Sequence, residues 1–381
     1  MASHNFDGYE AMAFSEPRYT VQEVNAAGKA LVRYLGEPSV DTWGDEDWRA
    51  YRSAVDVINN WRGAHAYPLN TFQINLRNVT RRLTSNPLVA QRIKRLFSIG
   101  LKLQLHPNMK LSQMQDLGGC RAILNDVASV KKVVEYYEKK SGIKHKRLPT
   151  DDYIIRPKAS GYRGVHLIYR YVSDKNKKAY NDLKIEMQLR SKYQHAWATA
   201  VETVGMFSGQ ALKSSLGSDD WKRFFALMGS AIAMREQSEI IPNTPTSKQS
   251  LIDELRDFSQ TLQVASRLKQ YNKALSALSN NVASNAYFYL LQLDPSRGTL
   301  QVKGYSANEV LEAEKQYAKA EEDVKSDGGD AVLVSVDSIN SLRKAYPNYF
   351  ADTRLFLELM EQALSGRSRS IRISDIKLAE G

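Results

Sequence analysis

An alternating strand near the middle of the chain constrains the fold and the function most strongly. In LKIEMQLR, residues 183–190, apolar side chains occupy every second position and polar side chains the positions between them. Because neighbouring side chains of a strand point to opposite faces of a sheet, one face is predicted to join the core, and the other presents Lys184, Glu186, Gln188 and Arg190. A carboxylate, an amide and a cation in a row suit a metal and phosphate site. An edge strand with a solvated polar face is the plain alternative.

A basic loop with two glycines precedes this strand. In RPKASGYRGVH, residues 156–166, Gly161 and Gly164 shape the backbone, and the cationic side chains and the histidine can reach phosphate groups. Tyr162 offers an exposed ring on which a base can stack. The pattern GxxxxGK[ST] does not occur in the chain, so this is not a Walker A loop. A basic surface turn is the alternative.

A second carboxylate lies at the entrance of an earlier strand. Asp116 precedes two glycines and the predicted strand CRAIL at 120–124. Magnesium commonly takes one or two carboxylates together with substrate phosphates, so Asp116 and Glu186 are candidates for one Mg²⁺ site. An ordinary turn aspartate is the alternative.

A basic segment, RIKRLFSIGLKL, begins at residue 92. Arg92 and Lys94 would share a face if this part is extended, and Ser98 could open a helix that contains Lys102. An amphipathic helix with one charged side explains the same pattern.

Positive charge is concentrated in this part of the chain. Residues 51–200 hold 28 Lys and Arg against 10 Asp and Glu, whereas the formal net charge of all 381 residues is +11. A local basic field of this size favours a phosphate-rich ligand, and nucleic acid is a natural candidate. A basic surface kept for solubility is the alternative.

Strands and helices alternate between residues 116 and 206, which predicts a catalytic core of mixed α and β structure. A stretch rich in Pro, Ser and Thr follows at 241–250, and a second, smaller pattern of strands and helices begins near residue 286. We predict an α+β fold with a catalytic domain at 1–245, a helical linker at 246–282 and a small α+β domain at 283–381.

Composition bears on the cellular compartment. The chain has no run of about 18 apolar residues, so no membrane-spanning helix is predicted. The single cysteine, Cys120, fits a reducing cytoplasm, and the six histidines lack the spacing of a zinc site. We expect a cytoplasmic protein.

Four motifs, in order, resemble the RelA/SpoT alarmone synthetase domain. They are Arg-x-Lys-x-x-x-Ser-Ile-x-x-Lys at 92–102, Asp-x-x-x-x-Arg at 116–121, Tyr-Ile-x-x-Pro-Lys-x-x-Gly-Tyr-x-x-x-His at 153–166 and Glu-x-Gln-x-Arg at 186–190. The resemblance covers roughly residues 20–210. It implies a nucleotidyltransferase-like mixed sheet flanked by helices. It also implies an ATP pyrophosphokinase, which moves the pyrophosphate of ATP to the 3′-hydroxyl of an acceptor and releases AMP.

The resemblance also implies roles on the ATP side. Arg92 and Arg121 would sandwich the adenine. The phosphates would be held by Lys94, Ser98 and Lys102.

At the reacting centre, Asp116 and Glu186 would be the Mg²⁺ ligands, and Glu186 would also activate the acceptor hydroxyl. Tyr162 would stack the acceptor base and complete the catalytic set. The residues expected to line the acceptor site are Lys158, Tyr162, Arg163, His166, Gln188 and Arg190.

The part at roughly 250–381 resembles the CapRel-type fused toxin–antitoxin proteins of phage defence. This implies that the C-terminal domain blocks the ATP site through a Tyr-x-x-Tyr motif, matched by Tyr346 and Tyr349, until a phage protein releases it. The expected trigger is the major capsid protein, and the implied acceptor is the 3′ CCA end of tRNA. A plain turn with two packed rings is the alternative for the motif.

Two other functions remain open. One is a small alarmone synthetase that makes (p)ppGpp from ATP and GDP or GTP. The other is an inactive RNA-binding module, which intact Asp116, Tyr162 and Glu186 argue against.

Overall fold

The computed structural model describes most of the chain, namely residues 14–36, 44–208, 219–269, 286, 288–294, 299–306, 309–323, 330–335 and 352–366. Tyr346, Tyr349 and the basic tail after Gly366 lie outside these ranges, so the prediction for the two tyrosines stays a prediction. Among the helices within these ranges, none has the length and apolar character needed to cross a membrane.

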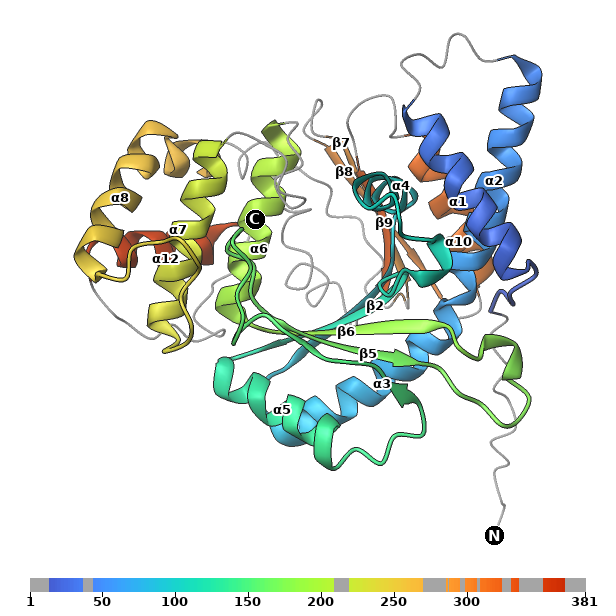
Figure 1. The fold of residues 1–381 in the computed structure, drawn as a ribbon, viewed down its shortest axis with the longest axis horizontal. Coiled ribbons are helices and arrows are strands. Elements are labelled where there is room, and N and C mark those ends of the chain that lie inside the picture. Colours follow the sequence, from blue (N-terminus) through green and yellow to red (C-terminus); the bar gives the residue numbers. More distant parts are fainter. Residues whose placement is uncertain are drawn as a thin grey trace.

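Within the described residues, a mixed sheet of nine strands forms the centre of the molecule (Figure 1). Its strands are β1 (Leu88–Ile93), β2 (Gly118–Leu124), β3 (Lys146–Arg147), β4 (Asp151–Asp152), β5 (Val165–Arg170), β6 (Lys184–Ser191), β7 (Phe288–Asp294), β8 (Thr299–Tyr305) and β9 (Asp330–Ser335). The order is β3-β5-β6-β2-β1-β9-β7-β8, with β4 paired to β5. Strands β2 and β6 run parallel, whereas β5 is antiparallel to β6, and β1 to β2. The predicted α+β class is confirmed.

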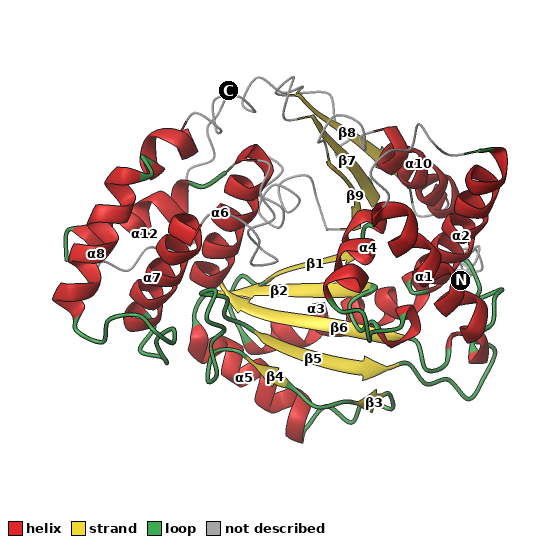
Figure 2. Ribbon diagram, turned by 45° about the horizontal axis from the view of Figure 1, so that its top comes forward, coloured by secondary structure: helices red, strands yellow, loops and turns green. Residues whose placement is uncertain are grey.

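Two helices cover one face of β1, β2, β5 and β6. They are α3 (Ala66–Leu83) and α5 (Val127–Lys139), and Figures 1 and 2 show both on the same side of these strands. Asp126 starts α5 by accepting a hydrogen bond of 2.7 Å from the Ser129 amide. Phe72 and Val130 on these helices pack against alternate strand residues such as Leu167 and Met187. The apolar face predicted for 183–190 is therefore core.

A second group of helices stands on the opposite face, near β1. It consists of α1 (Val21–Gly36), α2 (Asp45–Ala64) and α4 (Leu96–Leu105), followed by the short 3₁₀ turn η2 (Leu111–Gln113). Val24, Leu31 and Ile58 form its core with Ile99 and Leu103 of α4. This packing fixes α4, which carries Ser98 and Lys102, beside the sheet. Another 3₁₀ turn, η3 (Lys178–Tyr180), lies between β5 and β6.

A helical module flanks the sheet at the other end (Figure 2). Its members are α6 (Lys192–Ser208), α7 (Asp219–Arg235), α8 (Lys248–Thr261) and α12 (Arg354–Leu364). Phe356, Leu359 and Met360 of α12 are buried in the same apolar cluster as residues of α6, α7 and α8. A helix from the predicted C-terminal domain thus completes a core that begins in the predicted catalytic domain.

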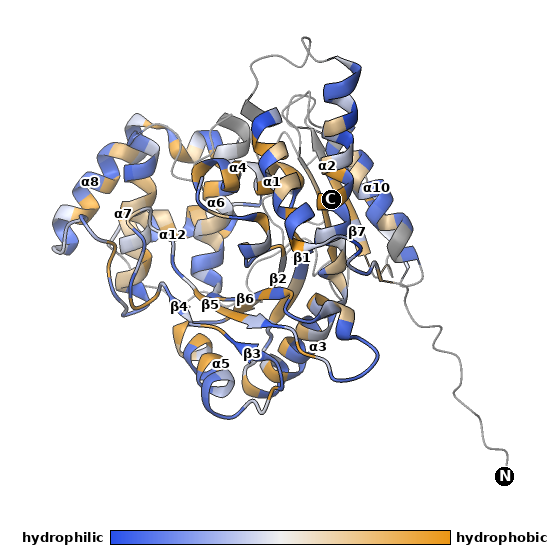
Figure 3. Ribbon diagram, turned by 45° about the vertical axis from the view of Figure 1, so that its right-hand side comes forward, coloured by the Kyte–Doolittle hydropathy of each residue, from blue (hydrophilic) through white to orange (hydrophobic). Residues whose placement is uncertain are grey.

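The C-terminal strands also continue the central sheet. Strand β9 pairs with β1, and Arg92 lies opposite Val334. Helix α10 (Val310–Asp323) packs on this extension through Ala313 and Tyr317. Figure 3 shows hydrophilic and hydrophobic residues mixed along α8 and α10, as expected for helices with one buried face. The boundaries predicted at 245 and 283 are therefore crossed by both a sheet and a helical core.

Candidate active site

Strand register brings the predicted site residues onto one face of the sheet. Arg92 lies opposite Gly119, which in turn lies opposite Glu186. Directly paired residues project to the same side, so these positions share the face opposite α3 and α5. Arg121 and Gln188 are paired on the same face.

A hollow that opens to solvent lies over these strands. Its lining residues are Ala90, Arg92, Asp116, Gly119, Cys120, Arg121, Glu186 and Gln188. Strand β6 is interior to the sheet, and Glu186 and Arg190 are 7% and 2% exposed. The solvated edge strand considered as an alternative is therefore wrong.

Asp116 is the centre of the side where ATP is predicted to bind, called the ATP side below. Its carboxylate accepts a hydrogen bond of 2.7 Å from Lys94 Nζ and one of 3.0 Å from Lys102 Nζ. Burial alone would raise the pKa of Asp116, but the two ammonium groups outweigh it and hold this pKa well below its usual range. The three predicted residues are thus brought together, and the carboxylate stays ionised.

The start of α4 receives a carboxylate that sequence reasoning missed. Glu321 of α10 accepts a hydrogen bond of 2.8 Å from the Leu96 amide and forms an ion pair with Arg62 of α2. Arg62 also lies over the ring of Tyr317, 4.9 Å from its centroid. Ser98, two residues into this helix, is half-buried. A carboxylate at a helix N-terminus is favourable, because the free backbone amides there carry partial positive charge.

Glu186 belongs to a chain of polar contacts on the side where the acceptor is predicted to bind, called the acceptor side below. Its carboxylate accepts hydrogen bonds from His166 Nδ1 at 2.8 Å and from Gln188 Nε2 at 2.5 Å. His166 Nε2 lies 2.5 Å from the Tyr162 hydroxyl, to which Arg190 donates at 2.8 Å. Arg190 also lies over the Tyr162 ring, 4.9 Å from its centroid. The prediction placed these five residues in one site, and the structure joins them directly.

The contacts in this chain change the acidity of its members. Burial would raise the pKa of Glu186, but His166 lowers it to about 2. Burial would lower the pKa of His166, but Tyr162 and Glu186 raise it to about 9. Burial would raise the pKa of Tyr162, but Arg190 and His166 lower it to about 8. The carboxylate is therefore kept ionised beside a cationic imidazole at neutral pH.

The other two residues expected at the acceptor site lie differently. Lys158 is exposed, with Nζ 4.3 Å from the ring centroid of Tyr153 and 5.6 Å from that of Tyr162. Arg163 turns away from the hollow and is 3% exposed, in an ion pair with Glu236. Its predicted contact with the acceptor therefore has no support in this geometry. The basic, glycine-flanked setting of Arg163 carried no signal of an inward turn.

The donor atoms in the hollow fit a magnesium ion. Asp116 and Glu186 both line it, and ionised carboxylates are the hard oxygen ligands that Mg²⁺ prefers. In the described part of the chain, no group of three or more His, Cys, Asp or Glu side chains is arranged to hold a metal. An ion here would accordingly depend on substrate phosphates for further ligands.

Comparison with known proteins places these residues in a family region. Residues 91–206 match the region found in RelA / SpoT proteins. No curated protein sequence matches the chain. Similar solved structures include small alarmone synthetase 2 from Bacillus subtilis, at 20% identity over 44% of this chain and 86% of that one, with a TM-score of 0.37. Small alarmone synthetase 1 from the same organism, bound to its product pppGpp, is 21% identical over 44% of this chain and 90% of its own, with a TM-score of 0.35. A GTP pyrophosphokinase family protein from Streptococcus pneumoniae is 22% identical over 52% and 92%, with a TM-score of 0.36.

The matched region contains all four motifs from Arg92 to Arg190. It confirms the predicted RelA/SpoT synthetase fold and the predicted class of enzyme, an ATP pyrophosphokinase. The resemblance of residues 250–381 to fused toxin–antitoxin proteins stays a prediction.

Proposed function

We propose that this protein transfers the pyrophosphate of ATP to the 3′-hydroxyl of the tRNA CCA end, and that its C-terminal part restrains it until a phage protein binds. The expected trigger is a major capsid protein, and the consequence would be a block of translation. The chemical part of the proposal rests on one observation: two ionised carboxylates, Asp116 and Glu186, line the same hollow as Arg92 and Arg121.

On the ATP side, Arg92 and Arg121 would hold the adenine between their guanidinium planes, because delocalised cations stack well on aromatic rings. Lys94 and Lys102 now neutralise Asp116. When ATP enters, its phosphates offer these ammonium groups new partners and Asp116 becomes free for Mg²⁺. The metal would neutralise charge on the transferring phosphoryl oxygens.

On the acceptor side, the 3′-oxygen would attack the β-phosphorus of ATP. The bond between that phosphorus and the oxygen bridging it to the α-phosphorus breaks, and AMP leaves with the bonding electrons. Glu186 would take the proton of the attacking hydroxyl, because its carboxylate lines the hollow and His166 Nδ1 holds it in place at 2.8 Å. Most of the acceleration is expected from positioning and electrostatics.

Tyr162 would stack the acceptor base, and Arg190 beside it is poised for a further polar group. Within the described residues, Nε and Nη1 of Arg190 are buried without a hydrogen-bond partner. A buried donor without a partner is costly, and an acceptor oxygen or phosphate would satisfy it.

A polynucleotide acceptor is supported by the position of other cations. Lys131 and Lys132 of α5 are exposed on the layer behind the sheet, away from the hollow. A single nucleotide bound in the hollow would not reach this layer, whereas a tRNA is large enough to contact both. GDP or GTP, which would make the product (p)ppGpp, is the competing acceptor.

Restraint by the C-terminal part is supported by Glu321, a carboxylate from α10 at the start of the helix that carries Ser98 and Lys102. Strand β9 beside Arg92 adds a second contact on the ATP side. The phage trigger follows from the resemblance of residues 250–381 alone.

The test uses the purified full chain and ATP labelled at the β and γ phosphates. The protein is incubated with one of three acceptors: tRNA, tRNA with a 3′-deoxy terminal adenosine, or a mixture of GDP and GTP. Each incubation is done with and without a major capsid protein. We expect label in intact tRNA only, and a loss of at least about 10³-fold in the Glu186→Gln variant, which removes the charge that holds metal and proton. Label in guanosine tetra- or pentaphosphate would make the protein an alarmone synthetase. Equal labelling by wild type and Glu186→Gln would overturn the mechanism.

A further inference from the structure

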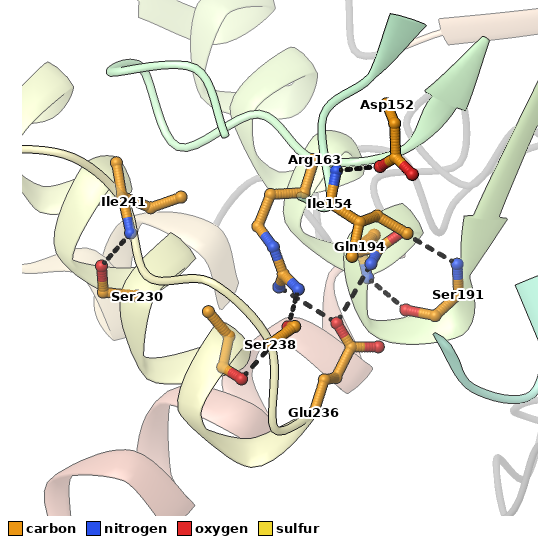
Figure 4. Close-up of polar contacts among 10 residues, drawn as sticks. Asp152, Ile154, Arg163, Ser191, Gln194, Ser230, Glu236, Ser238 and Ile241 are labelled. Carbon is orange, nitrogen blue, oxygen red and sulfur yellow. Dashed lines mark hydrogen bonds and ion pairs between the residues drawn. The ribbon is translucent and has the colours of Figure 1, made fainter. Parts of the chain in front are cut away.

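Arg163 is held inside the protein by residues that follow α7. Its Nη1 donates to Glu236 at 3.0 Å and its Nη2 to Ser238, and the side chains of Arg163 and Glu236 are 2% and 3% exposed. Gln194 of α6 donates to the same carboxylate at 3.2 Å, as Figure 4 shows. Removing either partner would leave an unpaired charge in the protein interior, which is strongly unfavourable. The ion pair therefore keeps both side chains in place.

The segment that carries Glu236 is itself fixed to α7. The Glu236 amide donates to the Ile232 carbonyl at 2.9 Å, which extends the helical pattern past its last residue. Further on, the Ile241 amide donates to Ser230 Oγ at 2.9 Å (Figure 4). Both ends of the segment are thus tied back to the helix, so Glu236 offers Arg163 a rigid partner.

The loop backbone at Gly161, two residues before Arg163, touches α7 directly. Gly161 has φ +96°, and a Cβ there would lie 2.7 Å from the Phe225 carbonyl oxygen and 2.7 Å from the Trp197 ring. The same carbonyl accepts a hydrogen bond of 2.8 Å from Trp197 Nε1. Only a glycine fits this close approach of loop and helix.

Tyr162 lies between these two anchors. Gly161 fixes the backbone on one side and Arg163 on the other, while the Tyr162 ring packs edge-on to Trp197 with centroids 6.4 Å apart. The direction of the ring is therefore set by α6 and α7, from behind the loop.

We propose that Glu236 is a positioning residue for the acceptor: by holding Arg163 against the end of α7, it orients Tyr162 for stacking on the acceptor base. Glu236 lies beyond the residues that match the RelA/SpoT region. The inference rests on the proposed function, in which Tyr162 binds the acceptor.

The kinetic test compares Glu236→Gln with Glu239→Gln, an exposed control on the same segment, in the full chain. With whichever acceptor the labelling experiment identifies, we expect Glu236→Gln to raise the KM for the acceptor at least about tenfold. The KM for ATP should stay within about twofold of wild type, because the ATP side does not depend on Arg163. Equal changes in both constants, or none, would overturn the proposal.

A second readout needs no catalysis. The amides of Lys158 and Gly161 are hydrogen-bonded within the loop, at 3.3 and 2.9 Å. Glu236→Gln should speed their hydrogen exchange at least about tenfold, while residues 92–102 exchange as in wild type. If no acceptor is labelled at all, faster loop exchange would still support positioning and the proposed function alone would fail. Unchanged loop exchange contradicts positioning whatever the acceptor.

If Glu236→Gln does not fold, Ser238→Ala replaces it. This variant removes the second partner of Arg163 and keeps the ion pair. The same two effects are expected at about threefold. A folded Ser238→Ala protein with wild-type loop exchange and acceptor KM would then overturn the proposal.

Discussion

The two sides of the hollow are held by different kinds of contact. On the ATP side, Lys94 and Lys102 are paired with Asp116 inside the site itself, and Glu321 occupies the start of α4. In the proposed function, substrate phosphates would replace Asp116 as the partners of Lys94 and Lys102. On the acceptor side, Tyr162 is oriented by buried packing and a buried ion pair outside the hollow. The ATP side is therefore exchangeable, and the acceptor side is preorganised.

The C-terminal part contributes to both sides. It reaches the ATP side through β9 and Glu321, and the acceptor side through α12, where Phe356 packs against Phe224 and Phe225 with ring centroids 6.3 and 5.9 Å apart. Arg235 of α7 also donates to Gln362 at 2.6 Å. Deleting the whole part would free one side and damage the other, so single substitutions separate the two effects more cleanly.

The largest expected difference between the two sides is in how far a glycine-to-alanine substitution lowers stability, at Gly161 on the acceptor side and at Gly119 on the ATP side. Gly161→Ala forces a Cβ into the Phe225 carbonyl at a positive φ, and should lower the free energy of unfolding by about 3 kcal/mol. At Gly119, on the floor of the hollow, the nearest atom to such a Cβ would be the Glu186 carbonyl oxygen at 3.9 Å. Gly119→Ala should therefore fold normally and raise the KM for ATP, because its methyl group enters the nucleotide space.

Urea unfolding and initial rates check both variants. Comparable stability of Gly161→Ala and wild type would mean that the loop can leave α7 at little cost. That result would remove the contrast between the two sides.

Local sequence patterns were sufficient to predict the face of the sheet that carries the site. The two-residue period of 183–190 separates Glu186 from Met187, and the strand at 120–124 becomes its parallel neighbour. The period depends on adjacent residues only, so the shared face of Glu186 and Gln188 could be predicted from them. That Arg121 joins this face was implied by the resemblance to the RelA/SpoT synthetase domain, because the pairing of two distant strands cannot be deduced from a local pattern.

Contacts between distant segments could not be anticipated in this way. Arg163 looked like a phosphate ligand because its basic neighbours are local, whereas its partner Glu236 is far along the chain. The pairing of β9 with β1 and the packing of α12 on α7 likewise depend on segments far apart in sequence. Local periodicity says which face of an element is buried, but not which element buries it.

A smaller effect is expected at the contact that links α10 to the ATP side. Glu321→Gln keeps the shape of the side chain but removes the charge that Arg62 and the Leu96 amide stabilise. We expect α10 to release the start of α4 more often, so the KM for ATP should fall about tenfold. Glu312→Gln is the matched control, since Glu312 is exposed and contacts Gln316 on its own helix. Initial rates measured against ATP concentration give the KM for ATP of both variants. If both variants match wild type, Glu321 does not restrain the ATP side.

The smallest effect concerns how the attachment of α10 to the rest of the protein depends on pH. Burial raises the pKa of Glu314 on α10 to about 7, against the opposing hydrogen bond of 2.9 Å from Ser15. The folded protein therefore binds this proton more tightly than the unfolded chain, whose carboxyl titrates near 4.5. The stabilisation is complete below pH 4.5 and is lost as the pH rises towards 7, so the free energy of unfolding should fall across this interval. Glu314→Gln, which stays neutral, should lack that part of the slope in urea midpoints measured from pH 4.5 to 8. Parallel curves for the two proteins would place Glu314 in contact with solvent, and α10 would then be attached to the ATP side through Glu321 without help from this buried carboxyl.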